Sequence, residues 1–368
     1  MSKRKNIKSN DSFSRIDAFR KAIDEIDEKI LDLINQRLLH SKEIGKVKKQ
    51  KGNQIFDGSR EGEIMNRLSA LNNGPIRNAS LLHIFSDIIA ESRQIQSAQV
   101  VTYLGPEATF THIAAMNHFG RSATFLPQPG IRDVFSEVEK ESCNYGVVPV
   151  ENSIEGAVNL TLDLLAESDL KICAEKYLSI SHDLLSATGS LDDIRQIYSH
   201  PHAFAQCRKW IKEYLPKAIL CECSSTAQAA QTALKQPGSA AIASNEAAQI
   251  YNLKIVASKV EDYTRNVTRF LIIGKDAIQR TGNDKTSIMF VTSHIPGALF
   301  KVLEPIAGAG INMLKLESRP SRHENWNYSF FVDLEGHIED QVIADTIAEM
   351  KNICLYLKSL GSYPRAPG

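Results

Sequence analysis

Residues 261–274 read EDYTRNVTRFLIIG, a run of charged and hydroxyl side chains that ends abruptly in an apolar segment at Phe270. The apolar segment has the length and composition of a buried β-strand. Polar side chains at the mouth of such a strand are where α/β folds place their binding and catalytic groups. The stretch is therefore compatible with two structures, an ordinary solvated loop that enters a strand or a functional edge of a sheet, and composition alone favours the loop.

The overall composition is that of a soluble protein of several domains. The 368 residues, 43% hydrophobic and 23% charged, are enough for two or three domains. Lysine plus arginine and aspartate plus glutamate both total 43, so the net charge is zero and nucleic acid is not expected as a partner. We expect neither a signal peptide nor a membrane span, because no apolar run of the required length occurs. The cysteines form no CxxC pair, so neither a zinc site nor a disulfide framework is expected, which suits a cytoplasmic location. No metal and no cofactor are expected.

A helical pattern runs from about residue 13 to about residue 50. Its apolar residues alternate in steps of three and four, the heptad stripe of a helix that needs a partner helix: Ile16, Phe19, Ile23, Ile26, Ile30 and Leu33. Continued with the same spacing, the stripe next includes Arg37. Burial of a charged side chain between helices is energetically unfavourable unless an anion pairs with it. A register that uses Ile34 and Leu38 and leaves Arg37 exposed fits the pattern equally well.

Three cations on this helix indicate a ligand site. Arg37 and Lys48 share a face about 16 Å apart along the axis, so both side chains could reach one small dianion. Arg20 lies about 25 Å from Arg37 and about a quarter-turn off that face. On a straight helix, Arg20 could serve only a site in another subunit.

Two shorter helices are expected after the long one. The first ends near Leu71, with Asp57 as a candidate N-cap and with Arg60 and Glu61 on its first turn. The second covers about residues 78–97. It places Ser92 and Gln96 on one face, four residues apart.

Residues 13–97 resemble the all-helical chorismate mutase domain that is fused to prephenate dehydratases. The resemblance implies a dimer paired along the long helix, in which each site borrows from the partner an arginine matched by Arg20. It implies that chorismate is also bound by Arg37, Lys48, Asp57, Arg60, Glu61, Ser92 and Gln96. Rearrangement to prephenate needs no nucleophile, so the site must hold a compact dicarboxylate and stabilise charge on its ether oxygen. Lys48 and Gln96 are the candidates for that oxygen.

From Val100 onward the pattern alternates strands with helices, so a domain boundary is expected near residue 98. The order predicts mostly parallel sheets in two α/β lobes that enclose a cleft, with the second lobe over about 181–259. Within the first lobe, the turn GPEATF at 105–110 could bind a carboxylate through its N–H groups or could only reverse the chain.

Residues 99–277 resemble prephenate dehydratases. NVTRF at 266–270 matches the threonine-arginine-phenylalanine signature of that family, and GPEATF matches its glycine-containing turn, with Ala108 in place of a second glycine. The resemblance implies a two-lobed fold like that of periplasmic binding proteins and the conversion of prephenate to phenylpyruvate. The catalytic positions that it implies are Thr268, Arg269, Glu151, Asn152, Ser153 and Gln206.

The implied reaction is driven by aromatisation, so the enzyme mainly helps hydroxide to leave. Thr268 is too weak an acid to release a proton and would hydrogen-bond the departing hydroxyl. Glu151, if protonated, is a possible proton source. Arg269 either binds a substrate carboxylate or only braces the loop. Arogenate remains open as an alternative substrate.

Residues 285–364 are expected to form a ferredoxin-like βαββαβ domain. They resemble the ACT domain, which binds amino acids. Two motifs match the phenylalanine-binding segments of dehydratase regulatory domains: Gly297-Ala298-Leu299 and Glu317-Ser318-Arg319-Pro320. The resemblance implies feedback inhibition by L-phenylalanine bound between paired regulatory domains.

The favoured interpretation is a bifunctional enzyme of phenylalanine biosynthesis that uses chorismate and prephenate and forms a homodimer or a larger homo-oligomer. A mutase fused to prephenate dehydrogenase would need a GxGxxG fingerprint after a strand, and the sequence has none. A sensor without enzymatic activity is the other alternative, and the matched mutase positions argue against it.

Overall fold

Three helices come first: α1 (Ile7–Gln50), α2 (Gly58–Leu71) and α3 (Asn78–Gln96). The computed structural model describes residues 7–50, 58–263, 265–320 and 328–366. Within it, α1, α3 and the second half of α2 belong to one compact unit, and the chain from residue 99 onward belongs to another. Helix α1 begins earlier than the expected position near residue 13. No helix of the described residues is apolar over a length that would cross a bilayer.

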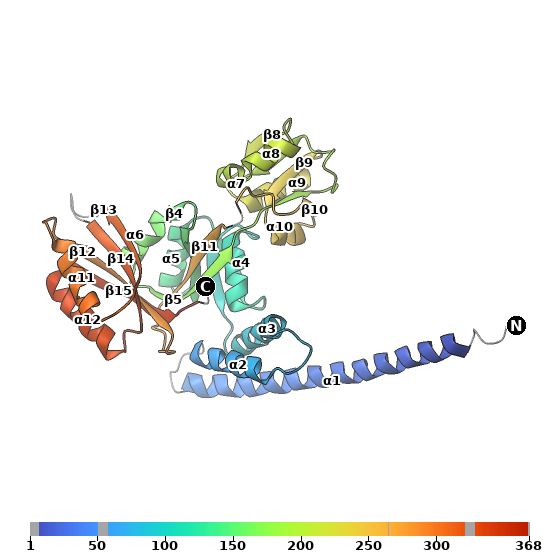
Figure 1. Ribbon diagram of the computed structural model, residues 1–368, viewed down its shortest axis with the longest axis horizontal. Helices are drawn as coiled ribbons and strands as arrows, with labels where there is room; N and C mark the ends of the chain where they lie inside the picture. The colour runs from blue at the N-terminus through green and yellow to red at the C-terminus, as the bar shows by residue number, and fades with distance from the viewer. Residues whose placement is uncertain (1–6, 51–57, 264, 321–327, 367–368) are drawn as a thin grey trace. The chain divides into compact units, whose positions relative to one another are not determined.

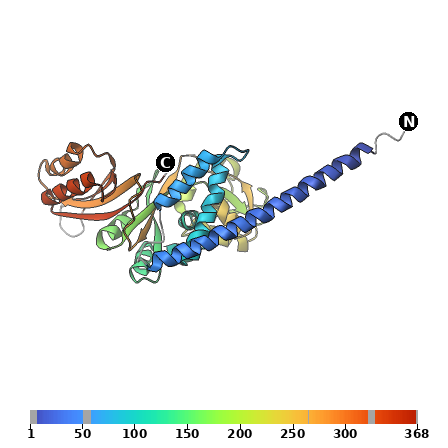
Figure 2. The same ribbon diagram turned by 90° about the horizontal axis from the view of Figure 1, so that it is seen from below.

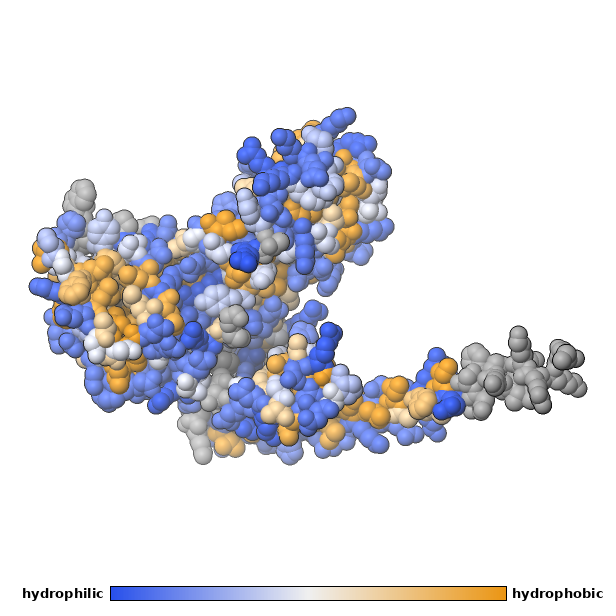
Figure 3. Space-filling view, in the orientation of Figure 1, coloured by the Kyte–Doolittle hydropathy of each residue, from blue (hydrophilic) through white to orange (hydrophobic). Residues whose placement is uncertain are grey.

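Helix α3 packs against the C-terminal half of α1 (Figure 2). Within residues 15–50 of α1, Ser41 and Gly45 are buried, and Arg37 on the same half is partly buried. The predicted heptad stripe extends over residues 16–33 of α1, and every residue of that stripe is exposed: Ile16, Phe19, Ile23, Ile26, Ile30 and Leu33. Figure 3 shows apolar side chains on the surface of this long helix. The stripe thus has no partner within the single chain among the described residues.

The first lobe of the second unit is built on a mixed sheet in the order β2-β1-β3-β11-β5, with β4 beside β3. Strands β1, β2 and β3 run parallel, whereas β11 is antiparallel to both of its neighbours. The bounds of these strands are β1 (Val100–Leu104), β2 (Thr124–Gln128), β3 (Tyr145–Asn152), β4 (Gly156–Ala157), β5 (Lys171–Ser179) and β11 (Val267–Gly274). The helices are α4 (Phe110–Phe119), α5 (Ile131–Glu139) and α6 (Asn159–Glu167).

The second lobe has a five-stranded sheet in the order β10-β6-β9-β7-β8. Its strands are β6 (Asp183–Ser186), β7 (Gln196–Ser199), β8 (Ile219–Glu222), β9 (Ser239–Ala243) and β10 (Lys254–Ala257). Its helices are α7 (Pro201–Gln206), α8 (Arg208–Tyr214), α9 (Thr226–Lys235) and α10 (Asn245–Ile250). Both sheets are mixed rather than mostly parallel. In the first, β11 runs antiparallel to β3 and β5, and in the second, β6 runs antiparallel to β9 and β10.

The C-terminal domain has the predicted βαββαβ order: β12 (Asp284–Thr292), α11 (Ala298–Gly308), β13 (Met313–Pro320), β14 (Tyr328–Glu335), α12 (Gln341–Ile353) and β15 (Tyr356–Pro364). Its antiparallel sheet has the order β13-β14-β12-β15, so β13 is an edge strand. One face of the sheet packs on α11 and α12. Figure 1 shows these helices on the side of the sheet away from the first lobe.

The other face of this sheet shares a hydrophobic core with the first lobe. Met289, Phe331, Leu360 and Tyr363 of the C-terminal domain belong to one buried cluster with residues of β3, α5, α6 and β11. At Gly361, where φ is +142°, a Cβ atom would lie 2.4 Å from the carbonyl oxygen of Ile172 in β5. Glycine therefore permits the backbones of the two domains to touch.

Candidate active site

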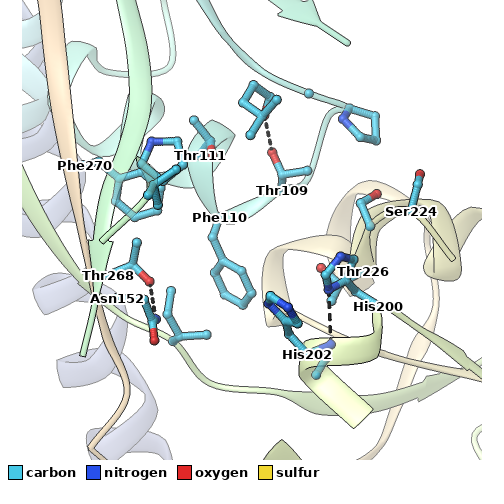
Figure 4. Close-up of a pocket in the computed structure, with 18 of the residues that line it drawn as sticks. Thr109, Phe110, Thr111, Asn152, His200, His202, Ser224, Thr226, Thr268 and Phe270 are labelled. Carbon is cyan, nitrogen blue, oxygen red and sulfur yellow. Dashed lines mark hydrogen bonds between the residues drawn. The ribbon is translucent and has the colours of Figure 1, made fainter. Parts of the chain in front are cut away.

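A cavity of about 810 Å³ lies between the two lobes of the second unit. Strands β3 and β11 of the first lobe supply Asn152, Thr268 and Phe270, and α7 of the second lobe supplies His202 and Gln206. Figure 4 shows Thr268 and Asn152 on one side of this space and the histidines on the other. The predicted cleft is therefore present, and the strand that follows residue 266 forms part of its wall.

Thr268 is hydrogen-bonded by Asn152 at the mouth of β11, and Asn152 in turn is held by Asn266. The Asn152 side-chain NH₂ donates to the Thr268 hydroxyl at 2.8 Å and to the Asn266 side-chain oxygen at 2.7 Å. The hydroxyl of Thr268 thus accepts one hydrogen bond, and no acceptor for its own hydrogen occurs among the described residues. That hydrogen is left to donate into the cavity.

Gln206 extends this polar network into the second lobe. Its side-chain oxygen accepts from Asn266 at 2.9 Å and lies 3.0 Å from Nε2 of His182. Its NH₂ donates to Glu155 at 3.3 Å, and Glu155 also pairs with His202 at 2.6 Å. Burial lowers the pKa of His182, so the imidazole is neutral near pH 7 and its Nε2 can donate to Gln206. The network thus joins both walls of the cavity.

The N-terminus of α4 lies beside the cavity and is shaped by Ala108. Thr109 caps α4, accepting from the backbone N–H of His112 at 3.3 Å. Ala108 has φ of +67° and is buried, and its N–H donates to Nδ1 of His112 at 3.2 Å. The left-handed backbone explains why glycine suits this position, and Ala108 adopts it with its methyl group packed in the second lobe.

Arg269 and Glu151, two of the predicted catalytic residues, lie on the face of the sheet opposite to the cavity. Side chains alternate along a strand, so Thr268 faces the cavity while Arg269 faces the opposite side of the sheet. Glu151 is paired with Arg269 across β3 and β11, so it also lies on that opposite side. Neither is among the cavity-lining residues. We therefore withdraw both as groups that touch the substrate.

Ser153 is exposed and has a local role. Its hydroxyl accepts from the N–H of Val267 at 2.9 Å and donates to the carbonyl of Arg265 at 3.2 Å. It does not line the cavity. Ser153 therefore fixes the segment that leads into β11.

The predicted mutase residues converge only in part within the single chain. Arg37 of α1 donates to the Ser92 hydroxyl of α3, and α1 and α3 approach closely where Gly45 meets Gln96. A Cβ at Gly45 would lie 2.8 Å from Cα of Gln96. Lys48 follows one turn later on α1 and is partly buried. Arg37, Lys48, Ser92 and Gln96 thus belong to one face between α1 and α3.

The other predicted mutase positions belong to different segments of the chain. Arg20 is on the exposed half of α1 and pairs with Asp17 at 3.4 Å. Arg60 is on α2 with Glu61 and contacts Glu63 at 2.9 Å. Asp57 lies outside the described residues. The single chain therefore does not bring Arg20 to the face that carries Arg37, as the helix geometry predicted.

Comparison with known proteins covers each of these parts. The chorismate mutase type II family model matches residues 19–97, the prephenate dehydratase model matches 101–278, and the ACT domain model matches 286–352. A bifunctional chorismate mutase/prephenate dehydratase of Aquifex aeolicus is 46% identical over 351 residues, which are 94% of this chain and 97% of that protein. The chain belongs to this bifunctional family. A relative from Escherichia coli K12 with the same description is 30% identical over 368 residues, 94% of this chain and 95% of that protein.

Solved structures agree with the fold of the dehydratase and ACT parts. A prephenate dehydratase from Arthrobacter aurescens in complex with L-Phe aligns with a TM-score of 0.67 and 36% identity, covering 73% of this chain and 90% of that chain. A structure described as a novel type of quorum quenching acylase aligns with a TM-score of 0.66 and 30% identity, covering 73% and 98%. The same fold thus carries different chemistry, so function must be argued from the site.

The two ACT motifs of this family member lie at different places in its C-terminal domain. Gly297, with φ of +78°, is the N-cap of α11, and Ala298 and Leu299 begin that helix. Glu317, Ser318, Arg319 and Pro320 end the edge strand β13. Arg319 lies 3.4 Å from Asp163 of α6 in the dehydratase part.

Several residues that the structure places at these sites are not among those predicted from the sequence. Asn266 stands inside the NVTRF signature and His182 follows β5, and neither belongs to the predicted catalytic set. Gly45 offered a signal, because a glycine inside a helix costs about 1 kcal/mol relative to alanine and so suggests a close approach. Lys315, two residues before Glu317, offered none, since its partner Glu151 is 164 residues away.

Proposed function

We propose that this chain rearranges chorismate to prephenate and then removes carbon dioxide and hydroxide from prephenate to give phenylpyruvate. The observation that carries the dehydratase proposal is the Thr268 hydroxyl, which accepts from Asn152 and keeps its own hydrogen for the cavity. A hydroxyl held in this way is a preorganised donor for the oxygen that leaves the ring, where negative charge develops.

The cavity offers backbone N–H groups rather than cations for the substrate carboxylates. No lysine or arginine is among the cavity-lining residues in the described part of the chain. The first turns of α4 and α9 meet the cavity at Thr109, Thr111 and Thr226. Free N–H groups at such helix starts suit anions. Glu155, His202 and Gln206 then connect the lobes across a bound substrate.

The mutase proposal rests on the face between α1 and α3. Arg37 and Lys48 are cations suited to the two carboxylates of chorismate, and Gln96 offers an amide at the same face. The Gln96 side-chain oxygen is buried and has no donor among the described residues. These groups would hold the compact conformer and stabilise the ether oxygen, which is all that a unimolecular rearrangement requires.

The decisive experiment incubates the purified chain with chorismate and follows chorismate, prephenate and phenylpyruvate over time by chromatography. We expect chorismate to fall, prephenate to appear transiently and phenylpyruvate to accumulate. Folded protein that leaves chorismate unchanged would refute the mutase proposal, and accumulation of prephenate alone would refute the dehydratase proposal. A parallel reaction with arogenate distinguishes the two possible dehydratase substrates.

We also propose a homodimer or larger homo-oligomer in the cytoplasm, paired along α1. Two observations support the pairing: the heptad stripe of α1 is exposed, and Arg20 sits on that exposed half. Such a stripe is stabilised by a second helix. Light scattering on the purified chain tests this, and a monomer at micromolar concentration with full mutase activity would contradict it.

L-phenylalanine is the proposed feedback inhibitor, bound at the Gly297–Leu299 and Glu317–Pro320 motifs. The support is the family match over 286–352 and the L-Phe complex of the Arthrobacter relative. A Glu317→Ala/Arg319→Ala variant should lose inhibition of the dehydratase by L-phenylalanine. Inhibition equal to that of the wild type would contradict the assignment.

A further inference from the structure

Strands β3 and β11 present two different residue pairs on their two faces. Thr268 and Asn152 are cross-strand neighbours on the cavity side, and Arg269 and Glu151 are cross-strand neighbours on the other side. Each cavity residue is thus joined by one peptide bond to a residue on the opposite face. Any displacement of Arg269 or Glu151 along or across the sheet must also move Thr268 or Asn152.

Both residues on the opposite face are held by the ACT sheet. Lys315 of β13 contacts Glu151 at 2.5 Å, and the Lys315 side chain is only 17% exposed. Arg269 contacts Asp333 of β14 at 2.7 Å and donates to the Tyr363 hydroxyl of β15 at 2.9 Å. The ACT sheet therefore contacts the strand pair directly behind the Thr268–Asn152 pair.

The contacts of Arg269 form a closed buried cluster with balanced charge. Glu175 of β5 accepts from Arg269 and from Lys285 of β12, both at 2.9 Å. With Asp333 the cluster holds two cations and two carboxylates, all with side chains less than 10% exposed. Removing one partner from such a cluster leaves an uncompensated buried charge, so its geometry is tightly constrained.

The strand that carries Lys315 also carries the second effector motif. Lys315, Glu317 and Arg319 are two residues apart along β13, so their side chains lie on the same face of the strand. This face is directed toward the dehydratase part, where Arg319 contacts Asp163. A ligand held at Glu317 or Arg319 therefore acts on the same strand face as the Lys315–Glu151 pair. Because β13 is an edge strand, it has only one neighbour in its sheet to hold it in place.

We propose that Lys315, Glu151 and Arg269 are positioning residues for the dehydratase cavity. Lys315 acts through Glu151 on the placement of Asn152, and the ACT sheet acts through Arg269 on the placement of Thr268. Through these contacts, a change in the position of β13 reaches the cavity. This assigns Lys315 a role that no motif indicates and changes Glu151 from a proton source to a positioning residue. It rests on the proposed dehydratase activity and on the proposed inhibition by L-phenylalanine.

The test compares variants of the full chain with prephenate as substrate, with and without L-phenylalanine. Lys315→Met removes the charge and keeps the length of the side chain, and Lys315→Arg keeps the charge. Lys275→Met is the matched control, because Lys275 forms an exposed 2.5 Å pair with Glu141 just beyond β11, at the end opposite Thr268. Mutase activity and thermal unfolding report that each variant is folded.

We expect Lys315→Met to lower the kcat of the dehydratase by about 3- to 30-fold with little change in KM, and to shift the inhibitory concentration of L-phenylalanine by a similar factor. Lys275→Met should stay within about twofold of the wild type, the range expected for a single exposed ion pair. Lys315→Arg should stay within the same range, because it keeps the charge that pairs with Glu151. A role in stability alone would lower Tm and leave kcat, KM and the response to L-phenylalanine of the folded enzyme unchanged.

Glu151→Gln provides a second measurement that does not depend on the folding of Lys315→Met. The amide still accepts from Lys315, so a positioning role predicts a loss of less than about tenfold, whereas loss of a general acid costs about 10²–10⁴-fold. The proposal would be overturned if Lys315→Met had the same kcat and the same response to L-phenylalanine as Lys275→Met. It would also be overturned if Glu151→Gln lost more than 10²-fold in kcat. A wild-type chain that does not convert prephenate would instead refute the proposed function.

Discussion

Replacing Thr268 with valine should remove the dehydratase activity and spare the mutase. Valine keeps the shape of threonine and removes the hydroxyl, which donates into the cavity and accepts from Asn152 at 2.8 Å. Removal of one preorganised donor to a developing negative charge costs about 10²–10³-fold in kcat, about 3–4 kcal/mol. The folded state loses only one neutral hydrogen bond, worth about 1 kcal/mol, so the protein stays folded.

The assay measures both activities on one preparation. Chorismate consumption should equal that of the wild type, because the predicted mutase residues lie in the segment before residue 98 and Thr268 does not, and prephenate should accumulate instead of phenylpyruvate. Thr268→Ser is the control, since serine keeps the hydroxyl and should retain activity within about tenfold of the wild type. A Thr268→Val enzyme with kcat within about threefold of the wild type would refute the role of the hydroxyl as a donor to the leaving group.

Three further predictions follow from close contacts and from burial. Gly45→Ala should lower mutase kcat by at least about tenfold while dehydratase kcat is unchanged, because the new Cβ would lie 2.8 Å from Cα of Gln96 and must push α1 from α3; wild-type mutase kinetics would contradict this. His182 has a pKa lowered by burial, so the unfolded state binds more protons and stability should fall as the pH drops below about 6.5. The urea midpoint should fall less between pH 7.5 and pH 5.5 for His182→Gln than for the wild type. Equal decreases would exclude this histidine as a source of the acid-induced loss of stability. Gly361→Ala should destabilise the chain by about 1–3 kcal/mol, since its Cβ would lie 2.4 Å from a backbone oxygen of β5; an unchanged Tm would show that the two domains do not touch at this position.

The order of elements could be predicted because it depends on local pattern, whereas Thr268 is selected through the resemblance of NVTRF at 266–270 to a family signature. The apolar run from Phe270 marks a strand, and a polar residue at its mouth is a candidate site wherever that strand lies. The side to which Arg269 points could not be predicted in the same way. That outcome depends on the register of β11 against β3 and on the presence of Asp333 and Tyr363 from a domain that begins later in the chain.

Arg37 shows a second limit of pattern reading. The heptad stripe and the shifted register were equally good descriptions of α1, and the structure contains elements of both. Ile34 and Leu38 are partly buried, and Arg37 between them is partly buried as well and donates to Ser92. Helix α3 decides this, since it covers only the C-terminal half of α1. Ala108 is similar, because its left-handed backbone follows from the turn and not from its residue type.

Because of its pairing with β3, strand β11 both places Thr268 in the cavity and places Arg269 against the ACT sheet, and the two functions cannot be separated. A slip of β11 by a single residue would exchange its two faces, carrying the guanidinium into the chamber between the lobes and leaving a threonine among buried carboxylates. Chemistry and attachment of the sensor would then be lost together. Selection for either property thus preserves the other, and insertions or deletions within 266–270 should be tolerated by neither.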